Sequence, residues 1–190
     1  MALRNTTAGW GALSQTFHWV IVALVAIQVV LALSAHDLPA GLQKLVLLAR
    51  HKSVGITILM LAVARLAWRV ANPVPELPST LKPYERALAR FTHFALYALL
   101  FAMPLTGWMM SSARGFPVSW FGLVQLPDLV PTDRGLYRIF HETHEVLARV
   151  LGAVVLLHIA GALKHHFVLR DGVLRRMLPF NRSGSRNLAS

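Results

Sequence analysis

Four long apolar segments constrain the fold of this chain more than any other feature. They lie at residues 14–35, 45–71, 87–113 and 139–168. Each segment reaches or exceeds the about 20 residues with which a helix crosses a hydrocarbon core of about 30 Å. Only 14% of all residues are charged, whereas soluble domains carry about 25%. The sequence therefore predicts an all-α integral membrane protein built as a four-helix transmembrane bundle.

The rest of the chain consists of a terminal tail and the connections between the four segments, within one predicted domain. Residues 1–180 contain the four segments, and residues 181–190 are expected to form a basic cytoplasmic tail. The longest connection, residues 111–137, includes the apolar run VSWFGLVQL, which could lie on the membrane surface or fold over the bundle. The absence of cysteine excludes disulfides, cysteine-bound iron–sulfur clusters and covalent haem attachment.

The net charge of +11 reflects membrane topology rather than nucleic-acid binding. If both termini lie on one side of the membrane, that side carries twelve Lys and Arg residues and the other side seven. The twelve are Arg4, Arg65, Arg69, Lys82, Arg86, Arg90, Lys164, Arg170, Arg175, Arg176, Arg182 and Arg186; the seven are Lys44, Arg50, Lys52, Arg114, Arg134, Arg138 and Arg149. Because positive residues concentrate on the cytoplasmic side, both termini are expected to be cytoplasmic.

Five of the nine histidines are expected at membrane depth: His18, His51, His93, His144 and His158. An ionisable side chain inside a membrane helix is costly, so its default interpretation is functional. A hydrogen bond to a neighbouring helix explains one such residue easily but explains five poorly. For the other histidines near the interfaces, such as His165, interfacial polarity is a sufficient explanation.

The spacing of these histidines predicts two cross-helix pairs. His144 and His158 are fourteen residues apart, so they share a helix face and lie about 21 Å apart along the axis. The topology places His51 at the outer end of the second helix and His18 at the inner end of the first. We therefore expect His51 to pair with His144 in the outer leaflet, and His18 with His158 in the inner leaflet.

The type of metal follows from the number of ligands. In HETHE the histidines are three apart, whereas a zinc protease motif needs a spacing of four. Carboxylate-bridged di-iron sites use Glu-x-x-His, which this stretch lacks. A histidine pair leaves zinc short of ligands, whereas haem supplies four equatorial nitrogens and needs only axial ones. Two non-covalent, bis-histidine b-type haems use every pair, with His144 as ligand and His141 nearer water.

Several stretches resemble the bacterial cytochrome b561 family, of the type related to nickel-hydrogenase cytochrome subunits. They are TFHW, RHKSVGI, THFALYALLFAMPLTGW, HETHEVLA and LHIAGALKHHFVLRDGVLRRMLP, and together they run from about Gln15 to Pro179. The resemblance implies a multi-pass protein of the bacterial inner membrane. The family's four axial histidines correspond to His18, His51, His144 and His158, which agrees with the pairing derived from the spacing.

Charged and polar residues near the pairs are candidates for further contacts. Haem propionates or a small anion could be met by Arg50, Lys52, Arg138 and Arg149 outside and by Arg65, Arg69 and Lys164 inside. A snorkelling side chain explains any one of these equally well. His93 and Lys164 are candidate contacts of a quinone or a propionate, although a helix–helix hydrogen bond accounts for His93 as well.

Haems in both leaflets would carry electrons across the membrane. Bis-histidine ligation fills both axial positions, which argues against oxygen binding at iron. The resemblance implies, for some members, an oxidoreductase that oxidises superoxide at the periplasmic face and reduces ubiquinone. The alternative is a haem-bearing anchor subunit of a larger dehydrogenase or hydrogenase complex, with a partner redox subunit. A metal or proton transporter is disfavoured because the two histidine pairs lie too far apart to pass an ion or a proton from one to the other.

The charge distribution generates a prediction for topology. A green fluorescent protein fused after Ser190 should fluoresce, and alkaline phosphatase fused there should be inactive, because the terminal side should face the cytoplasm. Fusions that are active only in the periplasm would reverse the assignment of compartments while leaving the histidine pairing intact.

Overall fold

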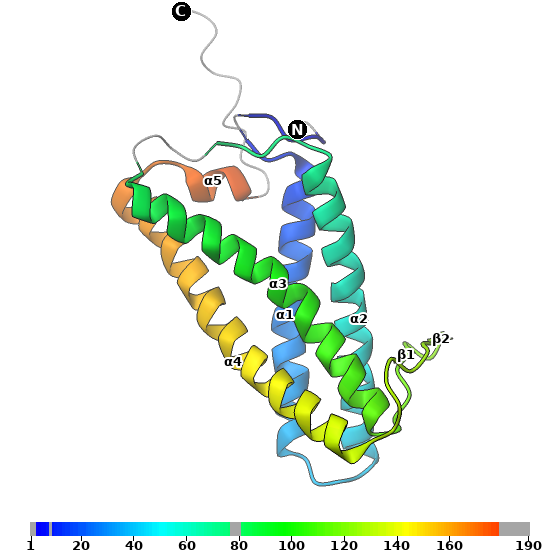
Figure 1. Ribbon diagram of the computed structural model, residues 1–190. Coiled ribbons are helices and arrows are strands. Elements are labelled where there is room, and N and C mark those ends of the chain that lie inside the picture. Colours follow the sequence, from blue (N-terminus) through cyan, green and yellow to red (C-terminus); the bar gives the residue numbers. More distant parts are fainter. Residues whose placement is uncertain (1–2, 8, 77–80, 179–190) are drawn as a thin grey trace, which may run out of the picture.

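The computed structural model describes residues 3–7, 9–76 and 81–178 (Figure 1). Its elements are α1 (Ala12–Asp37), α2 (Leu42–Val70), α3 (Pro83–Ala113), β1 (Ser119–Trp120), β2 (Val124–Gln125), α4 (Arg134–Lys164), the π-helical turn η1 (His165–Leu169) and α5 (Val173–Met177). Within the described residues, four helices are long and apolar enough to cross a membrane. The predicted four-helix membrane fold is confirmed, while the predicted tail at residues 181–190 lies outside the described residues.

The four long helices begin earlier in the chain than the apolar segments predicted. α3 begins at Pro83, where the missing proline N–H costs no hydrogen bond because the first helical turn lacks partners anyway. α4 begins after Asp133, whose side chain accepts a hydrogen bond of 2.8 Å from the Leu136 N–H. Polar residues at the helix starts therefore lie inside the helices, which apolar content alone does not reveal.

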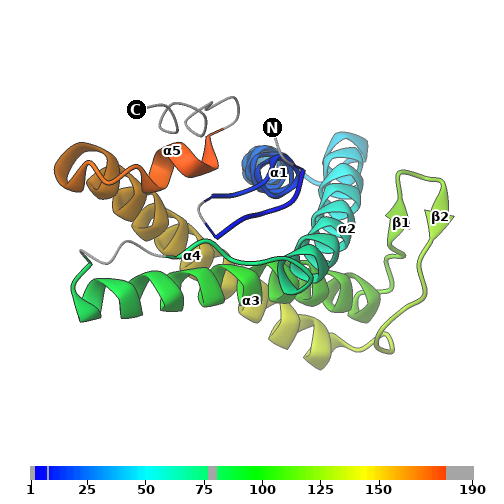
Figure 2. The ribbon, with the colours of Figure 1, turned by 90° about the horizontal axis from the view of Figure 1, so that it is seen from above.

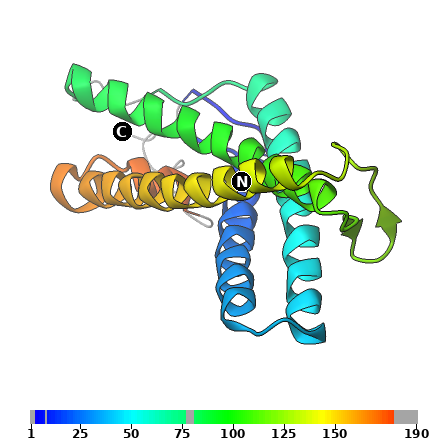
Figure 3. The ribbon, with the colours of Figure 1, turned by 60° about the horizontal axis from the view of Figure 1, so that its bottom comes forward.

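The helices are arranged as two antiparallel pairs that cross (Figures 2 and 3). α1 packs along α2, α3 packs along α4, and α2 contacts α3. The buried core lies where α1, α2 and α3 meet, around Ile21, Val54, Ile58, Ala62 and Leu100. By contrast, α4 contains no buried residue among its 31 residues and does not pack along the length of α1.

One end of the bundle, called the terminal end here, carries the N-terminal segment and α5 (Figure 1). The Trp19 indole donates to the Met177 carbonyl at 2.8 Å, and the Gln15 amide donates to the Arg176 carbonyl at 3.0 Å. These bonds tie α5 to α1 over a separation of about 160 residues in sequence. The segment after α4 therefore closes over the start of α1.

The opposite end, called the loop end here, carries a β-hairpin that folds against α2. β1 and β2 pair antiparallel, and the turn between them uses positive φ angles at Phe121 (49°) and Gly122 (74°). Ser53 accepts from the Phe121 N–H at 3.0 Å, and the Trp120 indole donates to the Thr57 hydroxyl at 3.0 Å. Of the two arrangements expected for this apolar run, the structure shows folding onto the bundle.

Asn5 generates the prediction for stability. Its buried side chain accepts from the Gly11 N–H at 3.0 Å and the Ser14 hydroxyl at 2.7 Å, and donates to the Pro73 carbonyl at 3.1 Å. Asn5→Ala leaves these groups unpaired and should lower the free energy of unfolding by about 1–3 kcal/mol. Denaturant titration of the detergent-solubilised protein measures the loss. Thr6→Ala, at an exposed neighbour, is the control, and an equal effect of both changes would contradict the role of Asn5.

Candidate cofactor site

Two pairs of histidine rings face each other across helices, at opposite ends of the bundle. In the loop-end pair, the ring centroids of His51 on α2 and His144 on α4 are 6.4 Å apart. In the terminal-end pair, those of His18 on α1 and His158 on α4 are 6.2 Å apart. The structure thus brings together the four residues that the spacing paired, in the same combinations.

The separation within each pair fits one metal ion between two imidazoles. Two metal–imidazole bonds of about 2.0 to 2.1 Å, each extended by the roughly 1.1 Å from a ring nitrogen to its centroid, give a centroid separation of about 6.3 Å. Both pairs lie within 0.1 Å of that value. In the part of the chain that the structure describes, no three His, Cys, Asp or Glu side chains converge as metal ligands. These pairs therefore suit a metal ion whose other ligands come from a macrocycle.

The histidines of both pairs are partly exposed, and two of them have unmet hydrogen-bonding capacity. All four rings are only half-buried by protein, and α4 lies in the bundle without a buried residue. The Nδ1 atoms of His18 and His51 are buried and have no hydrogen-bond partner. Buried polar atoms without partners are rare in folded proteins because they cost free energy. A flat ligand bound through the imidazoles would cover the exposed parts of these rings.

The His144 ring is held by two neighbouring residues of α3. The Thr106 hydroxyl lies 3.1 Å from His144 Nδ1. A Cβ atom on Gly107 would lie 3.1 Å from Cε1 of the same ring, so the glycine makes room for the imidazole. Thr106 and Gly107, called the seat of His144 here, belong to the loop-end pair.

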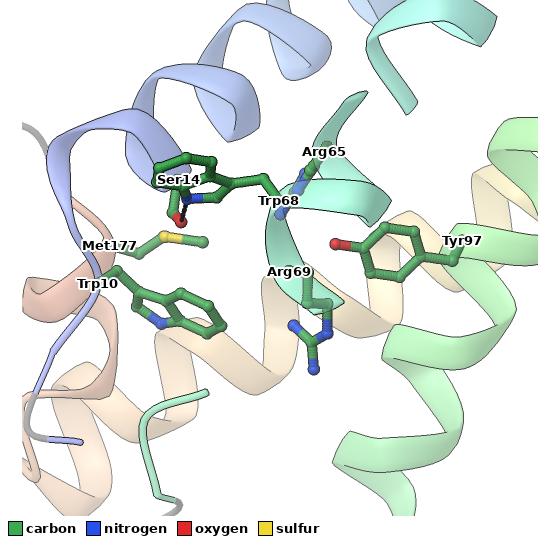
Figure 4. Close-up of a pocket in the computed structure, with 7 residues that line it drawn as sticks. All are labelled: Trp10, Ser14, Arg65, Trp68, Arg69, Tyr97 and Met177. Carbon is green, nitrogen blue, oxygen red and sulfur yellow. Dashed lines mark hydrogen bonds between the residues drawn. The ribbon is translucent and has the colours of Figure 1, made fainter. Parts of the chain in front are cut away.

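Figure 4 shows a group of basic and aromatic side chains that includes Arg65, Arg69 and Tyr97. Arg65 connects this group to the terminal-end pair. His93 on α3 places its ring edge against His158, with a centroid separation of 5.4 Å. Arg65 lies within electrostatic range of all three histidines. Arg65 and Arg69 direct their guanidinium groups over the Tyr97 ring, at 5.6 and 5.7 Å from its centroid.

Arg65 and Arg69 have no acidic partner within the described part of the chain. No acidic side chain lies within 4.0 Å of Arg65 or Arg69 among the residues that the structure covers. A membrane-embedded cation without a counter-charge is unfavourable, so the group is complementary to an anion such as a carboxylate. The two haem propionates expected from the sequence have that chemistry.

The other cationic residues singled out in the sequence have different surroundings. Lys164 forms an ion pair of 2.6 Å with Glu85 of α3. Lys52 donates to the Pro117 carbonyl at 2.9 Å and to the Ser111 hydroxyl at 3.2 Å, so it holds the loop after α3. Arg50 and Arg149 are exposed at the loop end. Arg138 is exposed there too.

The remaining histidines lie outside the pairs. His141 is 3.7 Å from Glu145 and contacts the Tyr137 ring, one turn from His144 toward the loop end. His36 is exposed beside Asp37. His165 was assigned to interfacial polarity, but its Nδ1 lies 2.5 Å from Asp171, within a half-buried ion pair that links η1 to the segment before α5.

Sequence reasoning missed two of these features. Thr106 was not singled out, although it lies between Pro104 and Gly107, two residue types that are unfavourable inside helices. The His165–Asp171 pair was missed because it depends on the π-helical turn, and no periodicity in the sequence indicates that turn.

Comparison with known proteins places the chain in a family. A family model described as prokaryotic cytochrome b561 matches residues 9–180. Cytochrome b561 homolog 2 of Escherichia coli strain K12 is 36% identical over 184 residues, covering 94% of this chain and 95% of that protein. Probable superoxide oxidase CybB of Yersinia pestis is 31% identical over 169 residues, covering 87% and 93%. Cytochrome b561 homolog 1 of Escherichia coli is 25% identical over 163 residues, covering 85% and 92%.

The family match spans all four long helices and both histidine pairs, and two of these relatives exceed 30% identity over most of their length. The match accounts for the apolar helices and for histidines at membrane depth. The chain belongs to the prokaryotic cytochrome b561 family, and it is a multi-pass b-type cytochrome of the inner membrane with a role in electron transfer.

Proposed function

We propose that the chain binds two haems b, one between His51 and His144 and one between His18 and His158. The single observation that carries this proposal is the presence of two cross-helix imidazole pairs, at 6.4 and 6.2 Å, on opposite halves of α4. Arg65 and Arg69 are placed to receive the propionates at the terminal end. At the loop end, we assign exposed Arg50 and Arg149 to attraction of a small anion rather than to propionate binding.

The proposed reaction is superoxide oxidation coupled to ubiquinone reduction. Haem b, when bound, supplies a one-electron couple in each leaflet. Two superoxide anions lose one electron each and leave as two dioxygen molecules. One ubiquinone takes up these two electrons and two protons to become ubiquinol. The superoxide half of this proposal is supported by the Yersinia pestis relative, a probable superoxide oxidase that is 31% identical to this chain.

The chain's own residues would set where each substrate approaches. We place the loop end in the periplasm, where Arg50, Arg138 and Arg149 can attract a small anion. We place the terminal end in the cytoplasm and propose a ubiquinone site near α1, α3 and α4. His93 is exposed there beside His158, and Lys164 is a second proposed contact of the quinone, with a charge partly offset by Glu85.

A second candidate function is that of a haem-bearing anchor for a partner redox subunit. The observation that favours it is the exposed apolar tip of the hairpin, where Phe121 is 53% and Leu123 is 75% exposed. Such a tip at the loop end offers a contact surface for another protein. In that case the electron donor is a protein, and superoxide reacts slowly with the cytochrome.

Histidine replacements test the ligand assignment. His144→Ala should remove the loop-end haem alone, because an isolated His51 cannot supply both axial positions. His141→Ala is the matched control from the neighbouring turn of α4 and should retain both haems. Absorption spectra and haem quantification on the purified variants give the result. Loss of a haem from the His141 variant but not from the His144 variant would disprove the assignment.

Salt and charge variants test the substrate. Stopped-flow mixing with superoxide should reduce the cytochrome quickly, and more slowly as ionic strength rises, because the Debye length falls to about 8 Å at physiological salt. Combined Arg50→Gln and Arg149→Gln should slow the reaction several-fold while both haems are retained. Lys52 is unsuited to this test because it holds the loop after α3.

The control for steering is Arg90→Gln, which alters an exposed cation on the α3 half nearer the terminal end. It should leave the rate with superoxide unchanged. Reduction no faster than the spontaneous dismutation of superoxide would reject the oxidase function and favour the anchor.

A further inference from the structure

We infer that Thr106 positions the haem ligand His144 by accepting a hydrogen bond from its Nδ1–H, and thereby lowers the reduction potential of the loop-end haem. The inference rests on the proposed ligation by His144. Thr106 lies on α3, which supplies no axial ligand, and it acts only through the imidazole. It is therefore a positioning residue rather than a ligand.

The direction of the hydrogen bond follows from the hydroxyl's other contacts. Thr106 is buried, with 8% of its surface exposed. Its Oγ1 lies 2.7 Å from the Ala102 carbonyl and 3.0 Å from the Met103 carbonyl, and both oxygens can only accept. The single hydroxyl proton is therefore directed along the helix. Toward His144, 3.1 Å away, Thr106 has only lone pairs to offer.

The protonated nitrogen of His144 is fixed by this arrangement. A neutral imidazole carries one proton, and a proton on Nδ1 leaves Nε2 with a free lone pair. Nε2 is then the atom available to iron. Gly107 reinforces the seat because any side chain there would press on Cε1, at 3.1 Å from a Cβ atom. The Met103 backbone also hydrogen-bonds the His144 imidazole, and a carbonyl there favours a protonated nitrogen on the same side. Thr106 and Gly107 add to this by fixing the position of the ring.

The effect on the haem follows from ligand basicity. A hydrogen bond accepted from the far nitrogen makes an imidazole a stronger electron donor, and this stabilises the more positive, oxidised iron. The Nδ1 atoms of His51 and His18 lack a hydrogen-bond partner in the structure. Of these three ligands, His144 alone therefore has such a hydroxyl acceptor, and the influence of Thr106 should be confined to the loop-end haem.

The test replaces the hydroxyl with a methyl group of the same shape. Thr106→Val should retain both haems and raise the reduction potential of the loop-end haem. We expect a change of about tenfold in the reduction equilibrium, which is about 59 mV for a one-electron couple. Spectroelectrochemical titration of the purified protein measures it. The same change in a His18→Ala background, where only the loop-end haem should remain, assigns the shift without overlap.

Matched variants separate the hydrogen bond from general disturbance of α3. Thr106→Ser keeps the hydroxyl and should keep the wild-type potential. Thr92→Val removes a buried hydroxyl of the same helix that donates to the Leu88 carbonyl at 2.8 Å, and it should shift neither haem. If Thr106→Val loses the loop-end haem, Thr106→Ser decides: a wild-type potential supports the inference, and haem loss with serine contradicts it.

The outcomes distinguish this inference from the proposed function. An unchanged potential in Thr106→Val with both haems present overturns the role of Thr106 and leaves the ligand assignment standing. Retention of both haems in His144→Ala overturns the ligand assignment, and the inference with it. A shift of equal size in the Thr92 variant would also overturn the inference, because the effect would then belong to the helix.

Discussion

The cost of placing imidazoles inside a bilayer governs the organisation of this protein. His18, His51, His144 and His158 lie on membrane-spanning helices, where lipid offers no hydrogen bonds. The protein offsets this cost only in part, since the Nδ1 atoms of His18 and His51 have no partner. In each pair the second imidazole comes from α4. Iron bound between the rings would use one nitrogen of each imidazole, while the other nitrogen would still need a hydrogen-bond acceptor, such as Thr106 beside His144.

The packing of the helices is consistent with a group bound between α4 and the other helices. α1, α2 and α3 share a small apolar core, whereas α4 has no buried residue and does not pack along α1. A prosthetic group bound by the histidines would therefore bury residues of α4 that the protein alone leaves partly exposed. The seat made by Thr106 and Gly107 and the basic group around Arg65 then give the two ends different electrostatic surroundings. Unequal surroundings are a means of giving two similar groups different potentials.

Much of the fold could be predicted from the sequence because lipid imposes simple rules. Continuous apolar runs revealed the four helices, and the fourteen-residue spacing of His144 and His158 revealed that two sites share one helix face. Features set by irregular backbone could not be predicted in this way. The hairpin at Trp120 depends on hydrogen bonds to Ser53 and Thr57, which lie more than sixty residues earlier. Lys52 bonds the loop after α3, and Lys164 pairs with Glu85. Both contacts depend on the tertiary structure, so the sequence could not exclude either lysine as a contact of a haem propionate or an anion.

The central claim is that each chain holds two haems b between its two histidine pairs. The most direct measurement combines a reduced-minus-oxidised spectrum with pyridine haemochrome quantification, set against protein concentration from amino-acid analysis. The account predicts a b-type spectrum and two haems per chain. A saturated preparation with one haem per chain, or with none, would contradict it.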